Sequence, residues 1–113
     1  MVRPTRYYSS RQEKQVAKIV KGKVNANSGA APFVAGDVVV ENILIECKTT
    51  TKQTNSYTIK KTILDKIKQE AYQMGKDHAV VAFNFEPNGE NYFILNTKFY
   101  KQLLDLYKKD NNS

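Results

Sequence analysis

Apolar residues at helical spacing predict the first two helices of the chain. One is expected to start at a cap formed by Ser9 or Ser10 and to continue to Lys21, where a glycine ends it. The second spans residues 59–74, and Gly75 follows it as a C-terminal stop. The inner side of the first helix is expected to consist of Val16, Ala17, Ile19 and Val20.

A third helix is expected from about Lys98 to Lys108, close to the end of the chain. Its buried stripe is predicted to be Phe99, Leu103, Leu104 and Tyr107. Outside the helices, residues 1–8 are expected to form a basic N-terminal arm, and residues 110–113 a frayed tail.

Two compact runs rich in β-branched residues predict a β-hairpin. Residues 37–40 and 43–48 form these runs, and only Glu41 and Asn42 separate them, as in a two-residue turn. If the turn has this length, Asp37 lies directly opposite Glu46 in the ladder.

The remaining segments predict shorter strands and loops. Residues 25–32 are small and polar, which fits either a short strand end or a loop, and residues 49–56 are expected to be a solvated loop or a frayed strand end. Residues 78–85 and 91–95 are expected to be strands joined by a turn at residues 86–89.

The expected order of elements is therefore α-β-β-β-α-β-β-α. This order predicts an α/β fold with a mixed central β-sheet flanked by helices. A length of 113 residues is enough for one core, so residues 1–113 are expected to form a single domain.

The charge of the chain favours a polyanionic partner such as nucleic acid. Its formal net charge is +7, and its pI is near 9.5. Much of the excess lies in residues 1–24, which contain seven basic residues and only one acidic residue, Glu13. An anionic membrane surface fits the charge as well, but no strongly amphipathic basic helix with large exposed apolar residues is evident.

The single cysteine, Cys47, excludes an intrachain disulfide and a cysteine metal cluster, and it fits a reducing compartment. No apolar run is long enough to cross a bilayer, and the start of the chain lacks the apolar region of a signal peptide. We therefore expect a soluble protein of the cytoplasm.

The expected hairpin places candidate chemistry on one strand face. Opposed side chains in a ladder have Cβ atoms roughly 4.5 to 5.5 Å apart, and like charges there destabilise a sheet. A divalent cation would offset the repulsion between Asp37 and Glu46, because Mg²⁺ prefers carboxylate and phosphate oxygens. Lys48 shares the face of Glu46, where its amine could act on a water or a phosphate. The alternative is that Asp37 closes a turn while Glu46 and Lys48 form an ordinary exposed ion pair.

These residues resemble a known signature. Gly36-Asp37, then eight residues, then Glu46-Cys47-Lys48 is similar to the motif of the PD-(D/E)XK nucleases. Gly36 stands where that motif has proline, which alters backbone stiffness and removes no ligand. With an acidic residue on the first helix, Glu13, and an Asn-Ser-Gly-Ala loop at residues 27–30, the chain is most similar to archaeal-type and phage Holliday junction resolvases, over roughly residues 9–105.

The resemblance implies a restriction-endonuclease-like core and roles for individual residues. Asp37 and Glu46 would bind one or two Mg²⁺ ions, for which Mn²⁺ could substitute, with the Cys47 carbonyl as a third ligand and Lys48 as the catalytic lysine. Glu13 would complete the metal site, although its spacing from Ser10 also fits a capping box. The side chain of Cys47 is expected to be small and buried rather than reactive.

The same likeness implies that Ser28 lies near the scissile phosphate. Alternatively, Ser28 is an ordinary turn serine beside Gly29. Tyr7, Tyr8 and Tyr57 could stack on a junction or pack at a core edge. Phosphate contacts are expected from a group of basic residues, each of which alone fits a solvated face. They are Arg3, Arg6, Arg11, Lys14, Lys52, Lys60 and Lys61.

The predicted function is Mg²⁺-dependent hydrolysis of DNA at four-way junctions, leaving 5′-phosphate and 3′-hydroxyl ends. A junction needs two symmetric incisions, so a homodimer is expected. Neither a small-molecule cofactor nor a membrane partner is expected. The alternatives are another nuclease of the same superfamily, of nicking, flap or restriction type, and a non-catalytic nucleic-acid-binding module. His78 is the only histidine, so a histidine-based metal site or a Ser-His-Asp triad has little support.

Overall fold

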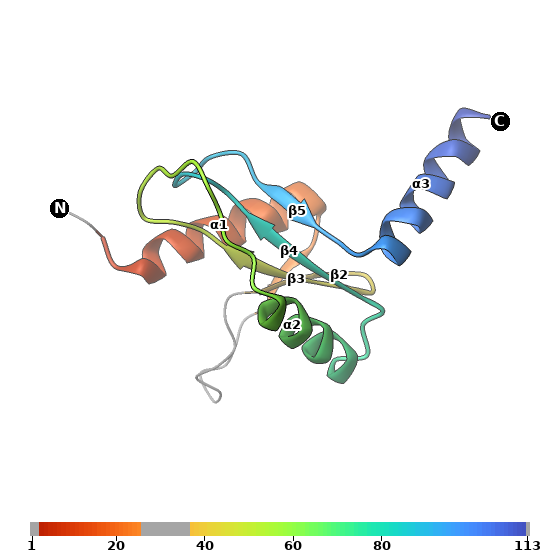
Figure 1. The fold of residues 1–113 in the computed structure, drawn as a ribbon, viewed down its shortest axis with the longest axis horizontal. Helices are drawn as coiled ribbons and strands as arrows, with labels where there is room; N and C mark the ends of the chain where they lie inside the picture. The colour runs from red at the N-terminus through yellow and green to blue at the C-terminus, as the bar shows by residue number, and fades with distance from the viewer. Residues whose placement is uncertain (1–2, 26–36, 113) are drawn as a thin grey trace.

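The computed structural model describes residues 3–25 and 37–112, and they form a mixed α/β fold (Figure 1). The order of elements is the expected one. The elements are α1 (Thr5–Val20), β1 (Lys23–Asn25), β2 (Asp37–Val40), β3 (Ile43–Lys48), α2 (Lys61–Gln73), β4 (His78–Phe83), β5 (Tyr92–Ile94) and α3 (Thr97–Asn111).

The five strands form one sheet in the order β1-β2-β3-β4-β5. Neighbouring strands are antiparallel except β3 and β4, which are parallel and are connected through α2. Glu41 takes a left-handed conformation with φ of 51° in the tight turn between β2 and β3. Because this turn has two residues, the predicted register is confirmed, and Asp37 pairs with Glu46.

Helices cover both faces of the sheet. Val38, Ile45 and Cys47 pack against Val16 and Ala17 of α1 on one face. On the other face, Leu44 and Val81 pack against Ile67 and Ala71 of α2. Successive strand residues therefore alternate between two apolar layers, which is the pattern of a sheet buried on both sides.

The N-terminal arm expected at residues 1–8 is wrong for residues 5–8, which belong to α1. Pro4 precedes the helix and its carbonyl accepts a hydrogen bond from the Tyr7 backbone N–H, so the helix starts before both predicted caps. Proline suits this place because its fixed φ fits a helix start and not a helix interior. Ser9 and Ser10 lie within the helix. Ile19, expected on the inner side, is exposed.

The last helix differs from the prediction in length and in packing. α3 extends to Asn111, so the tail expected from residue 110 is partly helical. Asn96 caps its start by accepting a hydrogen bond from Phe99 N, and Lys108 and Lys109 favour its C-terminal end. Of the predicted buried stripe, only Phe99 is buried and Leu104 is half-buried, whereas Leu103 and Tyr107 are exposed. The reason is that α3 projects away from the sheet (Figure 1).

None of the helices in the described parts of the chain is long and apolar enough to span a membrane.

Leu44→Ala should lower the free energy of unfolding by about 3 kcal/mol, because Leu44 is fully buried between the sheet and α2. Urea denaturation followed by circular dichroism measures this loss. Ile19→Ala on exposed helix surface is the matched control, with an expected change within about 0.5 kcal/mol. Equal effects of the two substitutions would contradict the described core.

Candidate metal centre

Two carboxylates lie side by side at one end of the sheet, beneath α2. The ladder pairs Asp37 of β2 with Glu46 of β3, and the alternation along both strands places these side chains on the face that α2 covers. Asp37 is 2% exposed and Glu46 is 1% exposed. Glu46 is therefore not part of an ordinary exposed ion pair.

The carboxylate oxygens of this pair lack hydrogen-bond partners. Asp37 Oδ1 and both Glu46 Oε1 and Oε2 are buried without a donor within hydrogen-bond distance among the described residues. Buried polar atoms in folded proteins almost always have a partner, because leaving one unpaired costs free energy. Three unpaired oxygens in one place could accept a further donor or bind a cation.

Burial and charge both disfavour the ionised form of these acids. Burial raises the pKa of Asp37 to about 7, and the charges of Glu46 and Glu70 add to the effect, while Lys66 opposes it. Burial also raises the pKa of Glu46, against the lowering effect of Lys48 and Lys66. The described residues therefore do not fully compensate two negative charges here.

Two lysines approach Glu46 from different elements. The Nζ atom of Lys48 lies 3.9 Å from Glu46 Oε2, and the Nζ atom of Lys66 lies 3.9 Å from Glu46 Oε1. Lys66 Nζ also lies 3.7 Å from Glu70 Oε1, one helical turn along α2. These distances are too long for hydrogen bonds, so the ammonium groups balance charge without occupying the oxygens.

The expectation that Asp37, Glu46 and Lys48 share one face is thus confirmed by the register, but Lys66 and Glu70 were missed. Their signal was present in the sequence. Residues 66 and 70 flank the apolar positions 67 and 71 on the second helix, so they lie beside its buried stripe. Which strand that stripe covers depends on the crossover between β3 and β4, which the sequence pattern did not define.

Glu13 is buried, but it belongs to α1, which packs on the opposite face of the sheet. Its carboxylate lies 3.4 Å from Arg6 Nη1, and burial raises its pKa against the opposing charges of Arg6 and Lys14. The capping-box alternative is wrong, because Ser10 lies inside the helix. Among residues 3–25 and 37–112, no three His, Cys, Asp or Glu side chains form a group that could hold a metal ion. The structure therefore does not join Glu13 to the acidic pair in a three-residue ligand set.

The other predicted site residues on this motif differ in their placement. The Cys47 side chain packs against α1, and burial raises its pKa to about 12, with smaller contributions from Glu13 and the acidic pair. This confirms that it is a buried small residue and not a reactive thiol. Ser28 and Gly36 lie outside the described residues.

A buried amide holds the end of β3 in place. Gln12 Nε2 donates hydrogen bonds to the Lys48 carbonyl at 2.8 Å, to the Ala82 carbonyl at 3.4 Å and to Asn91 Oδ1 at 3.0 Å. One side chain of α1 thus ties β3 and β4 to the residue that precedes β5. Gln12 was not singled out from the sequence, because a glutamine on a helix gives no periodic signal of burial.

All seven predicted phosphate contacts are exposed, on α1 or just before it and on the segment that leads from β3 into α2. α1 reaches the Lys48 end of the sheet through Gln12, and α2 begins there because it follows β3. Several of these side chains already have partners: Arg6 with Glu13, Arg11 with Asn88 Oδ1 at 3.0 Å, and Lys61 with Asp65 at 2.8 Å. The exposed set is Arg3, Arg6, Arg11, Lys14, Lys52, Lys60 and Lys61.

The tyrosines near this end pack on protein groups. Tyr57 stacks on Phe83 with ring centroids 4.6 Å apart, and burial raises its pKa, as does the charge of Glu46. This agrees with the core-edge alternative for Tyr57. Tyr7 contacts Tyr8 edge to face, and the guanidinium groups of Arg3 and Arg11 lie over its ring.

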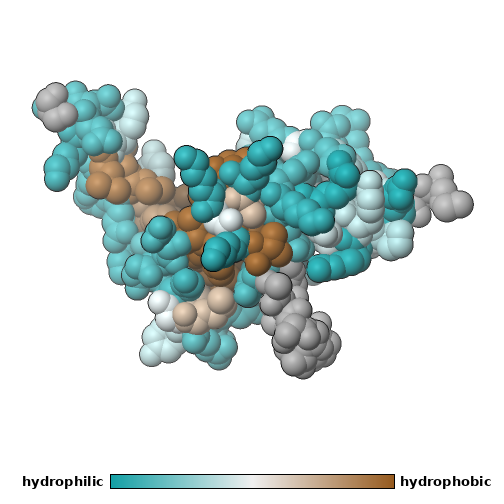
Figure 2. Space-filling model, turned by 180° about the vertical axis from the view of Figure 1, so that it is seen from behind, coloured by the Kyte–Doolittle hydropathy of each residue, from teal (hydrophilic) through white to brown (hydrophobic). Residues whose placement is uncertain are grey.

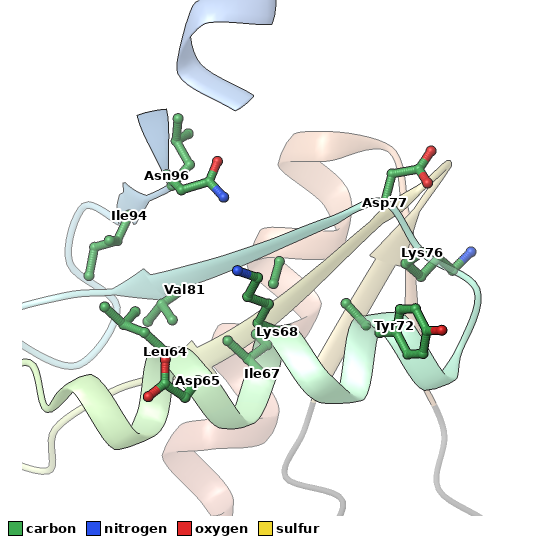
Figure 3. A pocket seen from close by; sticks show the side chains of 13 residues that line it. Leu64, Asp65, Ile67, Lys68, Tyr72, Lys76, Asp77, Val81, Ile94 and Asn96 are labelled. Carbon is green, nitrogen blue, oxygen red and sulfur yellow. The ribbon is translucent and has the colours of Figure 1, made fainter. Parts of the chain in front are cut away.

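A cavity of about 300 Å³ lies elsewhere on the α2 face, between α2, β4 and the segment that leads to α3 (Figure 3). Its lining includes Leu64, Ile67, Val81 and Ile94, with charged side chains such as Lys68 at its border. Neither carboxylate of the acidic pair contributes to it. The candidate metal centre and this cavity are therefore separate places on the α2 face.

No protein-family model matches the sequence, and no curated protein or solved structure is significantly similar to it. The chemistry of the site is therefore argued from its own residues. Two buried acids with unpaired oxygens, beside two ammonium groups and near exposed basic side chains, are suited to hold a hard cation next to a bound anion.

Stability in metal-free buffer should fall as the pH rises from about 4 to about 7. In the unfolded chain Asp37 loses its proton near its ordinary pKa of 3.8, whereas in the folded protein it keeps the proton up to about pH 7. The folded state thus binds more protons in this interval, and raising the pH favours unfolding. Asp37→Asn should remove part of this slope and raise the free energy of unfolding at pH 8 by about 1 to 3 kcal/mol.

Urea denaturation at pH 4.5 and pH 8 with a chelator measures the effect. Asp77→Asn is the matched control, since Asp77 is exposed at the start of β4, and it should leave the slope unchanged. An Asp37→Asn variant that is no more stable than the wild type at pH 8 would show that the acidic pair is not strained.

Proposed function

We propose that the protein is a Mg²⁺-dependent DNA endonuclease whose centre is the acidic pair of Asp37 and Glu46. The observation that carries the proposal is the set of unpaired, buried carboxylate oxygens on both residues, next to the amine of Lys48. The likeness of Asp37, Glu46 and Lys48 to the PD-(D/E)XK signature supports the same reading. The free, buried cysteine is compatible with a protein of the reducing cytoplasm, the location that we propose.

The residues fit a bound Mg²⁺ ion. Asp37 and Glu46 would hold it, with the Cys47 carbonyl as the further ligand that the likeness implies; Glu13, on the opposite face of the sheet, is not included. Such an ion needs only one or two carboxylates, because its remaining positions are taken by water and by substrate phosphate. When bound, it would polarise the phosphate and lower the pKa of a water molecule.

The chain's own side chains would stabilise the reacting phosphate, position the site and bind the DNA. Lys48 would neutralise charge that develops on the phosphate, since its ammonium stands beside Glu46 at the end of β3. Gln12 would keep that end of β3 in position through the Lys48 carbonyl. The exposed lysines and arginines around this end would bind the DNA backbone.

We further propose that the substrate is a four-way junction and that the chain acts as a homodimer, because paired incisions need two equivalent sites. Another nuclease of this kind, of nicking, flap or restriction type, would cut linear and branched DNA equally. A non-catalytic binding module would retain the basic surface without any metal-dependent cutting.

Asp37→Asn should lower the rate of Mg²⁺-dependent cutting by about a thousandfold or more, because one of two acidic ligands is lost. DNA binding should be unchanged or tighter, since a negative charge near the phosphate is removed. The measurement compares labelled four-way junction, flap, nicked and linear DNA side by side, with gel-shift binding in parallel.

Asp77→Asn again serves as the control and should cut like the wild type. Wild-type cutting by the Asp37→Asn variant would rule out the acidic pair as the centre. The absence of cutting by the wild type on all four substrates, with binding retained, would select the non-catalytic module.

Lys66→Met should tighten Mg²⁺ binding several-fold. The ammonium of Lys66 compensates Glu46 and Glu70 in the metal-free protein, so its loss leaves more negative charge for the ion to neutralise. Isothermal titration calorimetry with Mg²⁺ measures the change. Lys68→Met, exposed on the same helix, is the control, and equal affinities for the two variants would contradict a role for Lys66 at the site.

A further inference from the structure

α3 carries a broad apolar face that its own domain leaves uncovered. One side of this helix combines aromatic and leucine residues at spacings of three and four. We call this side the apolar face of α3, and its members are Phe99, Tyr100, Leu103, Leu104, Leu106 and Tyr107. Only Phe99 is buried, whereas Leu106 is 60% exposed and Tyr107 is 68% exposed.

The direction of α3 explains why the domain does not cover this face. Only Leu95 and Asn96 separate β5 from the helix, and the Asn96 cap fixes the first turn. Phe99 stacks on His78 with ring centroids 3.9 Å apart, which anchors that turn at the start of β4. Beyond it the helix leaves the body (Figure 1), and apolar atoms run along it and continue to the centre of the face shown in Figure 2.

We propose that a second copy of this chain covers the apolar face of α3, so that the α3 helices of two copies pack against each other in a two-fold dimer. The proposal rests on the proposed function in one respect, since it names the surface that would join the two sites a four-way junction needs. Its structural basis, an unpacked amphipathic helix, is independent of nuclease activity.

The available area suits such a dimer. Tyr100, Leu103, Leu106 and Tyr107 are between 42% and 68% exposed, so covering them in both copies would bury on the order of 900 Å². Specific interfaces bury about 1,200 to 2,000 Å² in total. The apolar surface that continues from the base of α3 would supply the remainder (Figure 2). A two-fold pairing places the apolar face of α3 against the same face of the second copy, so each copy covers the other.

The position of α3 leaves the candidate metal centre open. α3 is anchored at His78, where β4 begins, whereas Lys48 and Phe83 lie together at the other end of the parallel pair β3 and β4. The predicted phosphate contacts lie on α1 or just before it and on the segment that leads from β3 into α2, which reach that other end. A partner seated on α3 would therefore leave both acidic pairs and both basic surfaces free for DNA.

The test is the mass of the protein in solution without DNA or metal. Analytical ultracentrifugation of the wild type should give twice the chain mass of 12.9 kDa. The double variant Leu103→Gln with Leu106→Gln should raise the dimer dissociation constant by about a hundredfold or more. Each copy would lose two leucines that are exposed in the single chain and covered in the dimer. Glutamine has nearly the helix propensity of leucine and lysine, so α3 itself should persist.

The matched control is Lys101→Gln with Lys108→Gln, on the polar side of the same helix, which should remain dimeric. If the leucine double variant loses its helical circular dichroism signal, Tyr107→Gln near the free end of α3 gives the same readout. A monomeric wild type at every concentration, or a dimer that the leucine and lysine variants weaken equally, would overturn the proposal.

The two proposals fail in different ways. Asp37→Asn should remain dimeric while it loses cutting, and a dimeric wild type that cuts no DNA would overturn only the nuclease proposal. A monomeric wild type that cuts DNA with Mg²⁺ would overturn only the α3 dimer.

Discussion

The repulsion between Asp37 and Glu46 is the constraint on which the account of this protein depends. The two-residue turn between β2 and β3 places the acids opposite each other, and α2 then removes them from water. In that setting the charges need compensation, and the nearby ammonium groups of Lys48 and Lys66 stand too far away to bond the oxygens. The raised pKa of Asp37 favours a retained proton, and the cation that we propose would replace it.

The candidate metal centre and the apolar face of α3 lie toward opposite ends of the parallel strands β3 and β4. At one end, Gln12 ties α1 to the last residues of β3 and β4, and the acidic pair and exposed basic residues lie around this point. At the other end, Phe99 anchors a helix whose apolar face needs a partner. The metal and DNA chemistry that we propose for one end and the self-association that we propose for the other would therefore not compete for surface.

The elements and the hairpin register could be predicted from the sequence because they depend on local patterns. A run of β-branched residues, a two-residue turn and alternation were enough to bring Asp37 opposite Glu46. The start of α1 was missed because Ser9 and Ser10 looked like caps, although Pro4 begins the helix earlier. Long-range geometry was not available from these patterns. The burial of the acids under α2, the approach of Lys66 and the placement of Glu13 across the sheet all depend on how helices pack, as does the exposure of Leu103 and Tyr107 on α3.

A paramagnetic ion would locate the centre most directly. Mn²⁺ broadens the NMR signals of nearby nuclei, so a titration of labelled protein at pH 8 reports where the ion binds. The amide signals of Asp37 and Glu46 should broaden first, and substituting Glu46 by glutamine should abolish this broadening. Broadening that begins at exposed acids such as Asp77 or Glu86, or a spectrum that Mn²⁺ leaves unchanged, would contradict a metal centre at the acidic pair.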